Sequence, residues 1–465
     1  MNFRPLLLTG ILVAALGGSA RPQARPTIAF THATVIDVDK GTSLPGMTVV
    51  VAGGRITGVG PDGEVAAPAR ARIVEATGKF LIPGLWDMHV HAAWPGAEAI
   101  FLPLLVANGV TGVREMFSRL DWLATARARV RRGDLPGPRM VGSGHILDGR
   151  PPIWPGSVAV ANAAEARHAV DSLAAGGADF IKVYSRLSPE AFFAAAREAK
   201  AKGLPFAGHV PSLVSAAMAS DSGQRSIEHL TNVIAACSTD EPKYLALLAA
   251  AVASPGGWDS AGKISRGGAG LLASYSPERC RALARRFVAN GTWMVPTIAV
   301  LHSVAYLDDT TLALDPRLRY IPPGFSQSWN ARTDFRFRML TPEDWKSRKI
   351  GYARQLEIVT LLHAEGVKFL AGTDLSNPFI YPGFSLHDEL ASLVAAGFTP
   401  AEALRAATID PARYLDAADS LGSIAVGKRA DLVLLGANPL EDIRNTTKIE
   451  RCGGFFSTSW TRSSL

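Results

Sequence analysis

The sequence contains little cysteine. Three cysteines, Cys237, Cys280 and Cys452, are scattered over 465 residues. They are too few and too widely spaced for a disulfide framework or a cysteine-rich zinc site, and they allow one bridge at most. Any metal-binding or reactive chemistry must therefore come from histidine, aspartate, glutamate or lysine.

The sequence also lacks long runs of one charge. Its 48 lysines and arginines and 41 aspartates and glutamates leave a formal net charge of +7, and both signs are dispersed along the chain. There is no block of about five or six like charges with aromatic residues between them. The composition therefore gives no reason to expect a nucleic-acid partner.

The apolar run near the N-terminus is too short to span a membrane, which takes ~20 residues. Arg4 precedes the run at residues 6–16, and small residues follow at 17–20. This order is typical of an export signal, so we predict a signal peptide over residues 1–24, cleaved after Ala20 or Ala24. An uncleaved anchor is the alternative. The mature protein is expected to be periplasmic or secreted, with no stable membrane span.

Short β-branched runs and turn signals fill residues 25–79, and a similar pattern returns at residues 416–465. We therefore predict a small β-sandwich domain built from both ends of the chain. Between them, at residues 80–415, short apolar strands alternate with alanine-rich helices, which indicates an α/β fold with a parallel sheet. The eight strand candidates are residues 81–89, 110–116, 139–143, 180–184, 205–210, 226–230, 292–300 and 368–374.

Eight such strands predict a (β/α)8 barrel of the TIM type. The segment at residues 80–415 is longer than the ~250 residues typical of these barrels, so insertions are required. The segment at residues 316–348, within the stretch 301–350, is rich in proline, arginine and aromatic residues. It suits either a lid over the strand ends or a solvated surface excursion.

Candidate metal ligands fall at the predicted C-terminal ends of the strands, where barrel enzymes place their active sites. His89 and His91 share one face of a strand, although this motif alone is weak. Lys182 lies between apolar strand residues, where an unpaired ammonium is costly. His209, His229 and Asp374 follow three later strands. Each histidine alone could be structural, but together the six predict a metal centre.

Other polar residues have weaker claims. His145 and Tyr184 are candidates for substrate binding, with a structural hydrogen bond at the rim as the alternative for each. Asp87, Arg114 and Glu115 could orient the ligands. His387 is expected on the final helix, without a role in chemistry.

With these motifs the sequence resembles the amidohydrolase superfamily, in particular the branch of imidazolonepropionase-like proteins and metal-dependent Xaa-Pro and Xaa-Arg dipeptidases. The resemblance rests on His89-Val90-His91, the strand with Lys182, the two later histidines, Gly372-Thr373-Asp374 and the split β-domain. It implies two divalent metal ions. His89, His91 and Asp374 would bind one ion and His209 and His229 the other, and a carboxylated Lys182 would bridge them.

The resemblance implies hydrolysis of an amide bond, most plausibly in a dipeptide or an N-acyl amino acid. Two ions roughly 3.5–4 Å apart can share a water and lower its pKa toward about 7. Asp374 would act as general base and then general acid. Ligation without thiolate favours zinc, while manganese, cobalt and iron stay open.

Alternatives to this function are a cyclic amide or another carbon–nitrogen bond as substrate. A different class of function is a metal- or ligand-binding protein without catalysis. The oligomeric state, including a homo-oligomer, is left open by the sequence.

Overall fold

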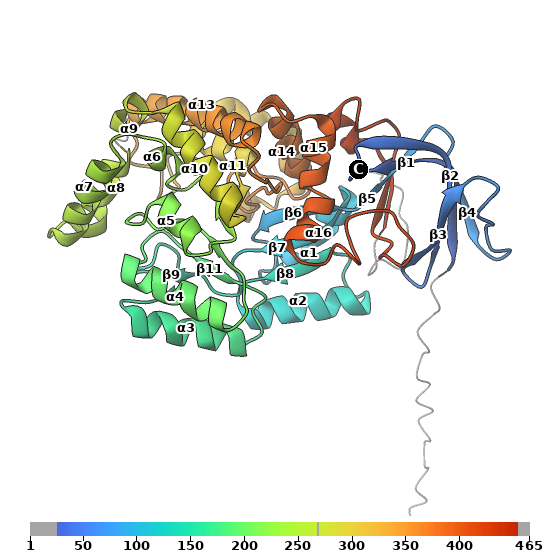
Figure 1. Ribbon diagram of the computed structural model, residues 1–465, viewed down its shortest axis with the longest axis horizontal. Coiled ribbons are helices and arrows are strands. Elements are labelled where there is room, and N and C mark those ends of the chain that lie inside the picture. Colours follow the sequence, from blue (N-terminus) through green and yellow to red (C-terminus); the bar gives the residue numbers. More distant parts are fainter. Residues whose placement is uncertain (1–25, 267–268, 454–465) are drawn as a thin grey trace, which may run out of the picture.

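The computed structural model describes residues 26–266 and 269–453. A twisted β-sheet lies at one end of the molecule and a larger α/β part makes up the rest (Figure 1). The predicted signal peptide at residues 1–24 lies outside the described residues. No helix within the described ranges is both long and apolar enough to pass through a membrane.

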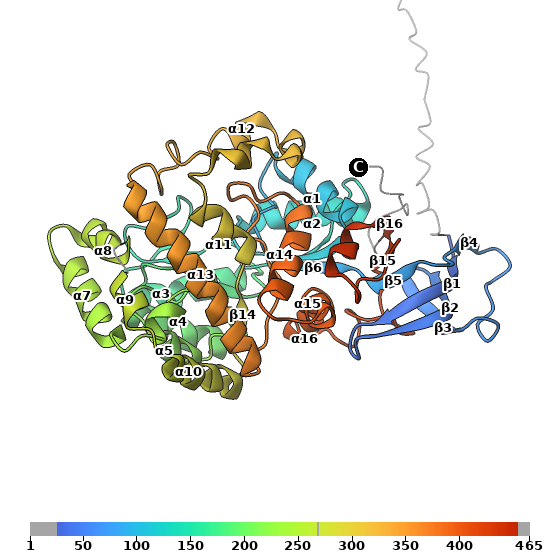
Figure 2. The same ribbon diagram turned by 90° about the horizontal axis from the view of Figure 1, so that it is seen from above.

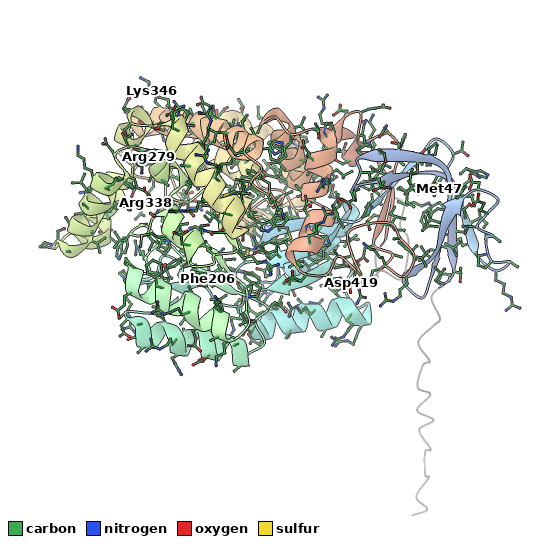
Figure 3. All side chains as sticks on the ribbon, viewed as in Figure 1. Met47, Phe206, Arg279, Arg338, Lys346 and Asp419 are labelled. Carbon is green, nitrogen blue, oxygen red and sulfur yellow. A yellow bond between two sulfur atoms is a disulfide. The ribbon has the colours of Figure 1, made fainter. Side chains whose placement is uncertain are left out.

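Both ends of the described chain contribute strands to the sheet at one end. Its order is β16-β15-β5-β1-β2-β3, and β4 also pairs with β1. The strands are β1 (Ile28–Asp37), β2 (Thr42–Ala52), β3 (Arg55–Pro61), β4 (Arg72–Glu75), β5 (Phe80–Pro83), β15 (Leu432–Leu435) and β16 (Ile449–Gly453). The join between the two ends is the antiparallel pair of β5 and β15. Met47 of β2 lies in this sheet, far from Phe206 in the α/β part (Figure 3).

Apolar residues on one face of this sheet form a separate core. Phe30, Val49 and Leu432 are each completely buried there, although they come from distant parts of the sequence. Because side chains alternate between the faces of a strand, β-branched runs of this kind can bury one side of a sheet. The packing of this core therefore holds the two ends of the chain together.

The α/β part contains two parallel sheets. One has the order β6-β7-β8 and the other β10-β9-β11-β12-β13-β14. The strands are β6 (Leu85–Val90), β7 (Val110–Glu115), β8 (Arg139–Gly142), β9 (Leu147–Asp148), β10 (Val158–Ala159), β11 (Ile181–Val183), β12 (Phe206–Gly208), β13 (Ser226–Glu228) and β14 (Trp293–Val295).

The predicted strand at residues 81–89 is correct only in part, because the structure divides it at Gly84 into β5 and β6, which belong to different sheets. The backbone N–H of Gly84 donates to Asp431, whereas that of Leu85 donates to Gly109. A side chain at position 84 would collide with Thr111. Glycine therefore allows the chain to pass from one sheet to the other at this point.

The predicted strand at residues 292–300 is correct only in its first half. After β14 the backbone of Thr297 takes a left-handed conformation, with φ of 50°, and helix α11 (Ile298–Ala305) begins. The predicted strand at 368–374 is not a regular strand. It still hydrogen-bonds to both neighbours, since Leu370 N–H donates to Met294 and Met88 N–H donates to Ala371, each at 2.9 Å.

Helices follow the strands and cover the outside of the parallel sheets (Figure 1). Helix α4 illustrates the local signals, because the Ser188 side chain caps its first turn, Pro189 is its first residue, and Phe192 is buried. The helices are α1 (Glu98–Ala107), α2 (Leu120–Arg132), α3 (Ala163–Ala175), α4 (Pro189–Ala201), α5 (Ala216–Asp221), α6 (Val233–Ala236), α7 (Glu241–Ala253), α8 (Gly257–Arg266), α9 (Ala269–Ala273), α10 (Pro277–Asn290), α11, α12 (Pro323–Ser326), α13 (Pro342–Ala364), α14 (Phe384–Ala395), α15 (Pro400–Ala406) and α16 (Ile409–Tyr414).

Helices α6 to α10 form an insertion between β13 and β14. A disulfide joins Cys237, at the end of α6, to Cys280 in α10, while Cys452 is free and buried. This agrees with the limit of one bridge expected from the sequence.

The segment at residues 316–348 is folded against the α/β part. It contains the short 3-10 helix at Pro316–Tyr320, then α12 and the first turns of α13, with α12 at one side of α11 (Figure 2). Trp329, Phe337 and Trp345 are each more than 90% buried. These aromatic residues dock the segment, so it is not a solvated excursion. Whether it acts as a lid stays a prediction.

Candidate metal centre

The carboxylate of Asp374 lies among three imidazoles. Its Oδ1 is 3.0 Å from His91 Nε2 and 3.4 Å from His89 Nε2, and its Oδ2 is 3.8 Å from His229 Nε2. His89, His229 and Asp374 offer ligand atoms that all lie within 4.8 Å of one another. These residues lie at or just beyond the C-terminal ends of parallel strands, where a metal ion could be held.

Two of these residues depend on an unusual backbone conformation. His229 and Asp374 have φ of 57° and 59°, in the left-handed region. This conformation costs about 1–3 kcal/mol for residues other than glycine. Backbone hydrogen bonds from His229 to Val295 (3.0 Å) and from Asp374 to His89 (2.8 Å) hold it in place. Both side chains therefore turn toward the cluster just after their strands end.

Hydrogen bonds fix which nitrogen of His89 and His229 faces Asp374. His89 Nδ1 lies 2.8 Å from Glu228 Oε2, and the carboxylate can only accept, so we infer that Nδ1 carries the proton. His229 Nδ1 lies 2.7 Å from Thr297 Oγ1, whose hydroxyl donates to the Pro296 carbonyl. Each Nε2 then presents a lone pair, as metal-binding histidines do.

Burial keeps the imidazoles neutral. It lowers the pKa of His89 well below its ordinary value, and the nearby Lys182 lowers it further. Burial alone would raise the pKa of Asp374, but its interactions with the surrounding histidines, including the hydrogen bond from His91, hold the pKa well below its ordinary value. Neutral imidazoles beside an ionised carboxylate are the protonation states that a divalent cation requires.

Glu228 is itself held by Arg114. The Arg114 Nη2 donates to both oxygens of Glu228, at 2.8 and 2.9 Å, and its Nε donates to the Met88 carbonyl at 2.7 Å. The other terminal nitrogen of Arg114 donates to Ser226 and Tyr414, each at 2.9 Å. The paired charges are buried, so the position of His89 depends on an ion pair hidden from solvent.

Lys182 and His209 complete the cluster. The Nζ of Lys182 lies 3.3 Å from His89 Nε2, its side chain is buried, and burial lowers its pKa to about 8. Lys182 makes no ion pair within residues 26–266 and 269–453. The His209 ring lies 4.9 Å from that of His229, and its buried Nε2 has no hydrogen-bond partner in the described chain. All six predicted ligands thus meet in one place, and their roles as ligands stay predictions.

Two buried carboxylates hold the loops that carry the cluster. Asp87 accepts hydrogen bonds from the Thr373 N–H and hydroxyl, at 3.0 and 2.6 Å, and from the His89 N–H at 3.2 Å. Glu115 accepts from the N–H groups of Ala92 and Ala93. Burial raises the pKa of Asp87 to about 7 and that of Glu115 to about 8.

The predicted substrate residues are already engaged with the protein. The Tyr184 hydroxyl accepts from Trp154 Nε1 at 2.8 Å, and its ring lies 3.9 Å from that of His209. His145 Nδ1 lies 2.7 Å from the Gly156 carbonyl. Tyr184 therefore borders the cluster, whereas His145 hydrogen-bonds to the neighbouring loop. Their substrate contacts stay predictions.

The sequence motifs do not include Glu228, Thr297, Trp154 or Ser185. The Ser185 hydroxyl lies 3.0 Å from His209 Nδ1. A carboxylate at the end of the buried strand β13, directly before His229, is a signal that could have identified Glu228, whereas Thr297 has no distinguishing pattern. His387 is buried on α14, with Nδ1 2.9 Å from Thr446 Oγ1 and Nε2 3.1 Å from the Asn108 carbonyl.

Imidazole, carboxylate and lysine without thiolate are ligand types suited to zinc, manganese, cobalt or iron. The arrangement fits a metal site on two counts. The Nε2 atoms of His89, His91 and His229 converge on one carboxylate, and the buried Nε2 of His209 has no protein partner among the described residues.

Comparisons with known proteins agree with this site. Residues 80–451 match the model of the Amidohydrolase family. A predicted prolidase from Bifidobacterium longum has a similar structure, with a TM-score of 0.68 and 25% identity over 94% of this chain and 96% of its own. A Xaa-Pro dipeptidase with methionine bound in its active site also has a TM-score of 0.68, with 19% identity over 94% of this chain and all of its own.

Sequence relatives are matched only in part. The imidazolonepropionase of Anaeromyxobacter dehalogenans (strain 2CP-C) is 32% identical over 134 residues, which cover 24% of this chain and 31% of the relative. Adenine deaminases are matched over shorter stretches.

The chain belongs to the amidohydrolase family and has its α/β fold of the TIM-barrel type. It is a hydrolase acting on carbon–nitrogen bonds, in a family that generally uses divalent metal ions. The prediction of the family from the sequence is confirmed.

Proposed function

We propose that the protein hydrolyses an amide bond in a dipeptide or an N-acyl amino acid, with divalent metal ions as cofactors. The observation that carries this proposal is the convergence of His89, His91 and His229 on Asp374. The prolidase and dipeptidase whose structures resemble 94% of this chain support the choice of substrate class.

The residues fit two divalent ions, for which zinc is favoured. His89, His91 and Asp374 would hold one and His209 and His229 the other, with a carboxylated Lys182 between them. The amine of Lys182 would add to carbon dioxide, forming an N–C bond and releasing one proton. This replaces a buried cation that has no ion-pair partner among the described residues by an anionic ligand. When bound, the ions would supply Lewis acidity for the carbonyl and for a water.

The chain's own residues would then move the protons. Asp374 would accept a proton from the attacking water and return it to the leaving amine. Its pKa, held well below the ordinary range, keeps the carboxylate ionised before the proton is transferred. Tyr184 and His145 would contact the substrate from the rim of the site.

A cyclic amide is the second candidate for the substrate. It is favoured by the similarity to an imidazolonepropionase, although that similarity covers 31% of the relative. The same proton transfers by Asp374 would serve it.

Further proposals concern architecture and location. The two parallel sheets would form one closed (β/α)8 barrel, and residues 25–79 and 416–465 would form a β-sandwich. We propose export to the periplasm or outside the cell after cleavage of residues 1–24. The disulfide between Cys237 and Cys280 supports this, since disulfides persist in oxidising compartments.

The test is metal content combined with turnover. The purified protein, supplied with zinc, manganese or cobalt and with bicarbonate, is assayed on dipeptides, N-acyl amino acids and cyclic amides. About two metal ions per chain and turnover on the first two classes support the proposal. Asp374→Asn should abolish turnover even where metal remains. No metal and no turnover in the wild-type protein would disprove it.

A further inference from the structure

A cavity of about 550 Å³ borders the candidate metal centre. His229 contributes to its lining, so the cavity and the centre share a residue. Its volume falls within the ~300–1,000 Å³ typical of small-molecule sites. The neighbouring space could therefore receive part of a substrate held at the metal centre.

Apolar side chains make up much of the wall. They come from the insertion after β13 and from helix α11, and they include Leu230, Ile234, Leu271, Leu301 and Val304. Helix α13 supplies Tyr352 to the lining, and α11 and α13 pack against each other (Figure 2). A cavity built in this way favours an apolar group over a charged one.

Two charged residues of the lining are engaged with the fold. The Arg348 guanidinium lies 5.0 Å from the Phe337 ring. The Asp344 carboxylate accepts from the Thr341 N–H and hydroxyl at the start of α13, each at 2.8 Å. These contacts stabilise helix α13, and the apolar side chains are the largest group among the other residues of the lining.

We propose that this cavity receives a bulky apolar or aromatic group attached to the scissile amide, and so makes the enzyme selective for such substrates. The proposal rests on the proposed function, which places the amide at the metal centre. A substrate with only a glycine at this position would leave the cavity unfilled and would gain no binding energy from its apolar wall.

Gly351 offers a way to fill the cavity without disturbing the core. It lies in α13 and contributes to the lining, and a Cβ added there meets nothing within 4 Å. Gly351→Phe should therefore occupy space in the cavity, while Gly351→Ala adds one methyl group and controls for the loss of glycine. Lys346→Ala, at an exposed position of the same helix (Figure 3), controls for changes to α13. Both Gly351 variants should fold, because glycine is the poorer helix former.

The experiment compares the wild-type holoenzyme and the three variants on glycyl-glycine, phenylalanyl-glycine and glycyl-phenylalanine. Wild type should prefer one phenylalanine dipeptide over glycyl-glycine by about tenfold or more in kcat/KM. Gly351→Phe should remove this preference and leave glycyl-glycine within about twofold, whereas the two controls should keep it. If the preference for phenylalanine survives in Gly351→Phe, or is absent from wild type, the cavity proposal is wrong. Turnover of any of these dipeptides would still support the proposed function.

Calorimetric titration with L-phenylalanine and glycine tests the cavity independently of turnover. Wild type should bind phenylalanine at least about tenfold more tightly than Gly351→Phe does. If wild type hydrolyses neither these dipeptides nor N-acyl amino acids but this difference is found, the proposed function fails and the apolar site stands. If no dipeptide is hydrolysed and phenylalanine binds both proteins equally, or neither of them, the cavity proposal is wrong as well.

Discussion

His89 and Glu228 are joined by a buried hydrogen bond of 2.8 Å between Nδ1 and Oε2. Arg114 donates to the same carboxylate, so the predicted metal ligand His89 is hydrogen-bonded to a buried ion pair. An interaction of this kind orients the imidazole and leaves Nε2 free to bind a cation. Residues that never touch the metal should therefore affect how tightly it binds.

Glu228→Gln should weaken metal binding by about 10- to 100-fold, the usual cost of removing a group that orients a ligand. It also leaves Arg114 without its anionic partner in a buried site, so the free energy of unfolding should fall by roughly 3 kcal/mol. Competition with a chelator measures the first effect and urea unfolding the second.

Glu357→Gln is the matched control, because it removes the same charge from a surface pair with Arg354. Its effect on unfolding should stay below about 1 kcal/mol, and metal binding should not change. If Glu228→Gln binds metal as tightly as wild type, the orienting role of Glu228 is wrong.

The hydroxyl of Thr297 has a similar role for His229, which it contacts at 2.7 Å. Thr297→Val keeps the shape of the side chain but removes the acceptor for the Nδ1 proton, so metal affinity and kcat/KM should each fall about tenfold or more. Thr297→Ser keeps the hydroxyl and should stay within about threefold of wild type. Equal losses in both variants would point to packing of the methyl group instead.

The sequence predicts the fold class well because the signals are local. Apolar strands and alanine-rich helices alternate along the chain, and each element can be identified from its own residues. The predicted strand boundaries are wrong where a single residue alters the path of the backbone. Gly84 moves the chain between two sheets, and Thr297 ends β14 early by taking a left-handed conformation.

The candidate site is predictable to a similar extent. His89 and Lys182 lie on the regular strands β6 and β11. The alternation of side chains between the two faces of a strand therefore identifies them as candidate ligands. His229 and Asp374 lie beyond strand ends with left-handed backbones, a conformation that histidine and aspartate adopt more often than most residues but that no local pattern assigns to these two positions. The pairing of Arg114 with Glu228 spans 114 residues and leaves no local pattern.

Lys182→Ala should bind fewer than two metal ions per chain and lose most of its activity, about 100-fold or more, because the group between the two ions is removed. Metal content and kcat/KM are measured after incubation with zinc and bicarbonate. In wild type, bicarbonate together with metal should restore activity to metal-depleted protein, and Lys182→Ala should not respond.

Lys200→Ala, at an exposed position of α4, is the control and should behave as wild type. Urea unfolding of Lys182→Ala verifies that the variant is folded. If this variant kept two ions and full activity, the assignment of a two-metal centre would be wrong.

His387 provides a test of stability against pH at a distance from the proposed ligands. It is buried between Thr446 and the Asn108 carbonyl, and burial lowers its pKa from 6.5 to about 4. Between these two values the unfolded chain binds a proton that the folded protein excludes. The free energy of unfolding should therefore fall as the pH drops below 6.5, by about 1.4 kcal/mol per pH unit and roughly 2 kcal/mol at pH 5.

His387→Gln removes this titration while keeping groups that can donate and accept hydrogen bonds. Its free energy of unfolding should be lower than that of wild type at pH 7.5, because the fit is poorer, but should fall less steeply between pH 6.5 and 5. Urea unfolding at several pH values gives both slopes, and His168→Gln, at an exposed position of α3, should follow wild type. Parallel curves for wild type and His387→Gln would mean that His387 already takes up a proton in the folded protein, and that its contact with the Asn108 carbonyl outweighs the cost of burying the charge.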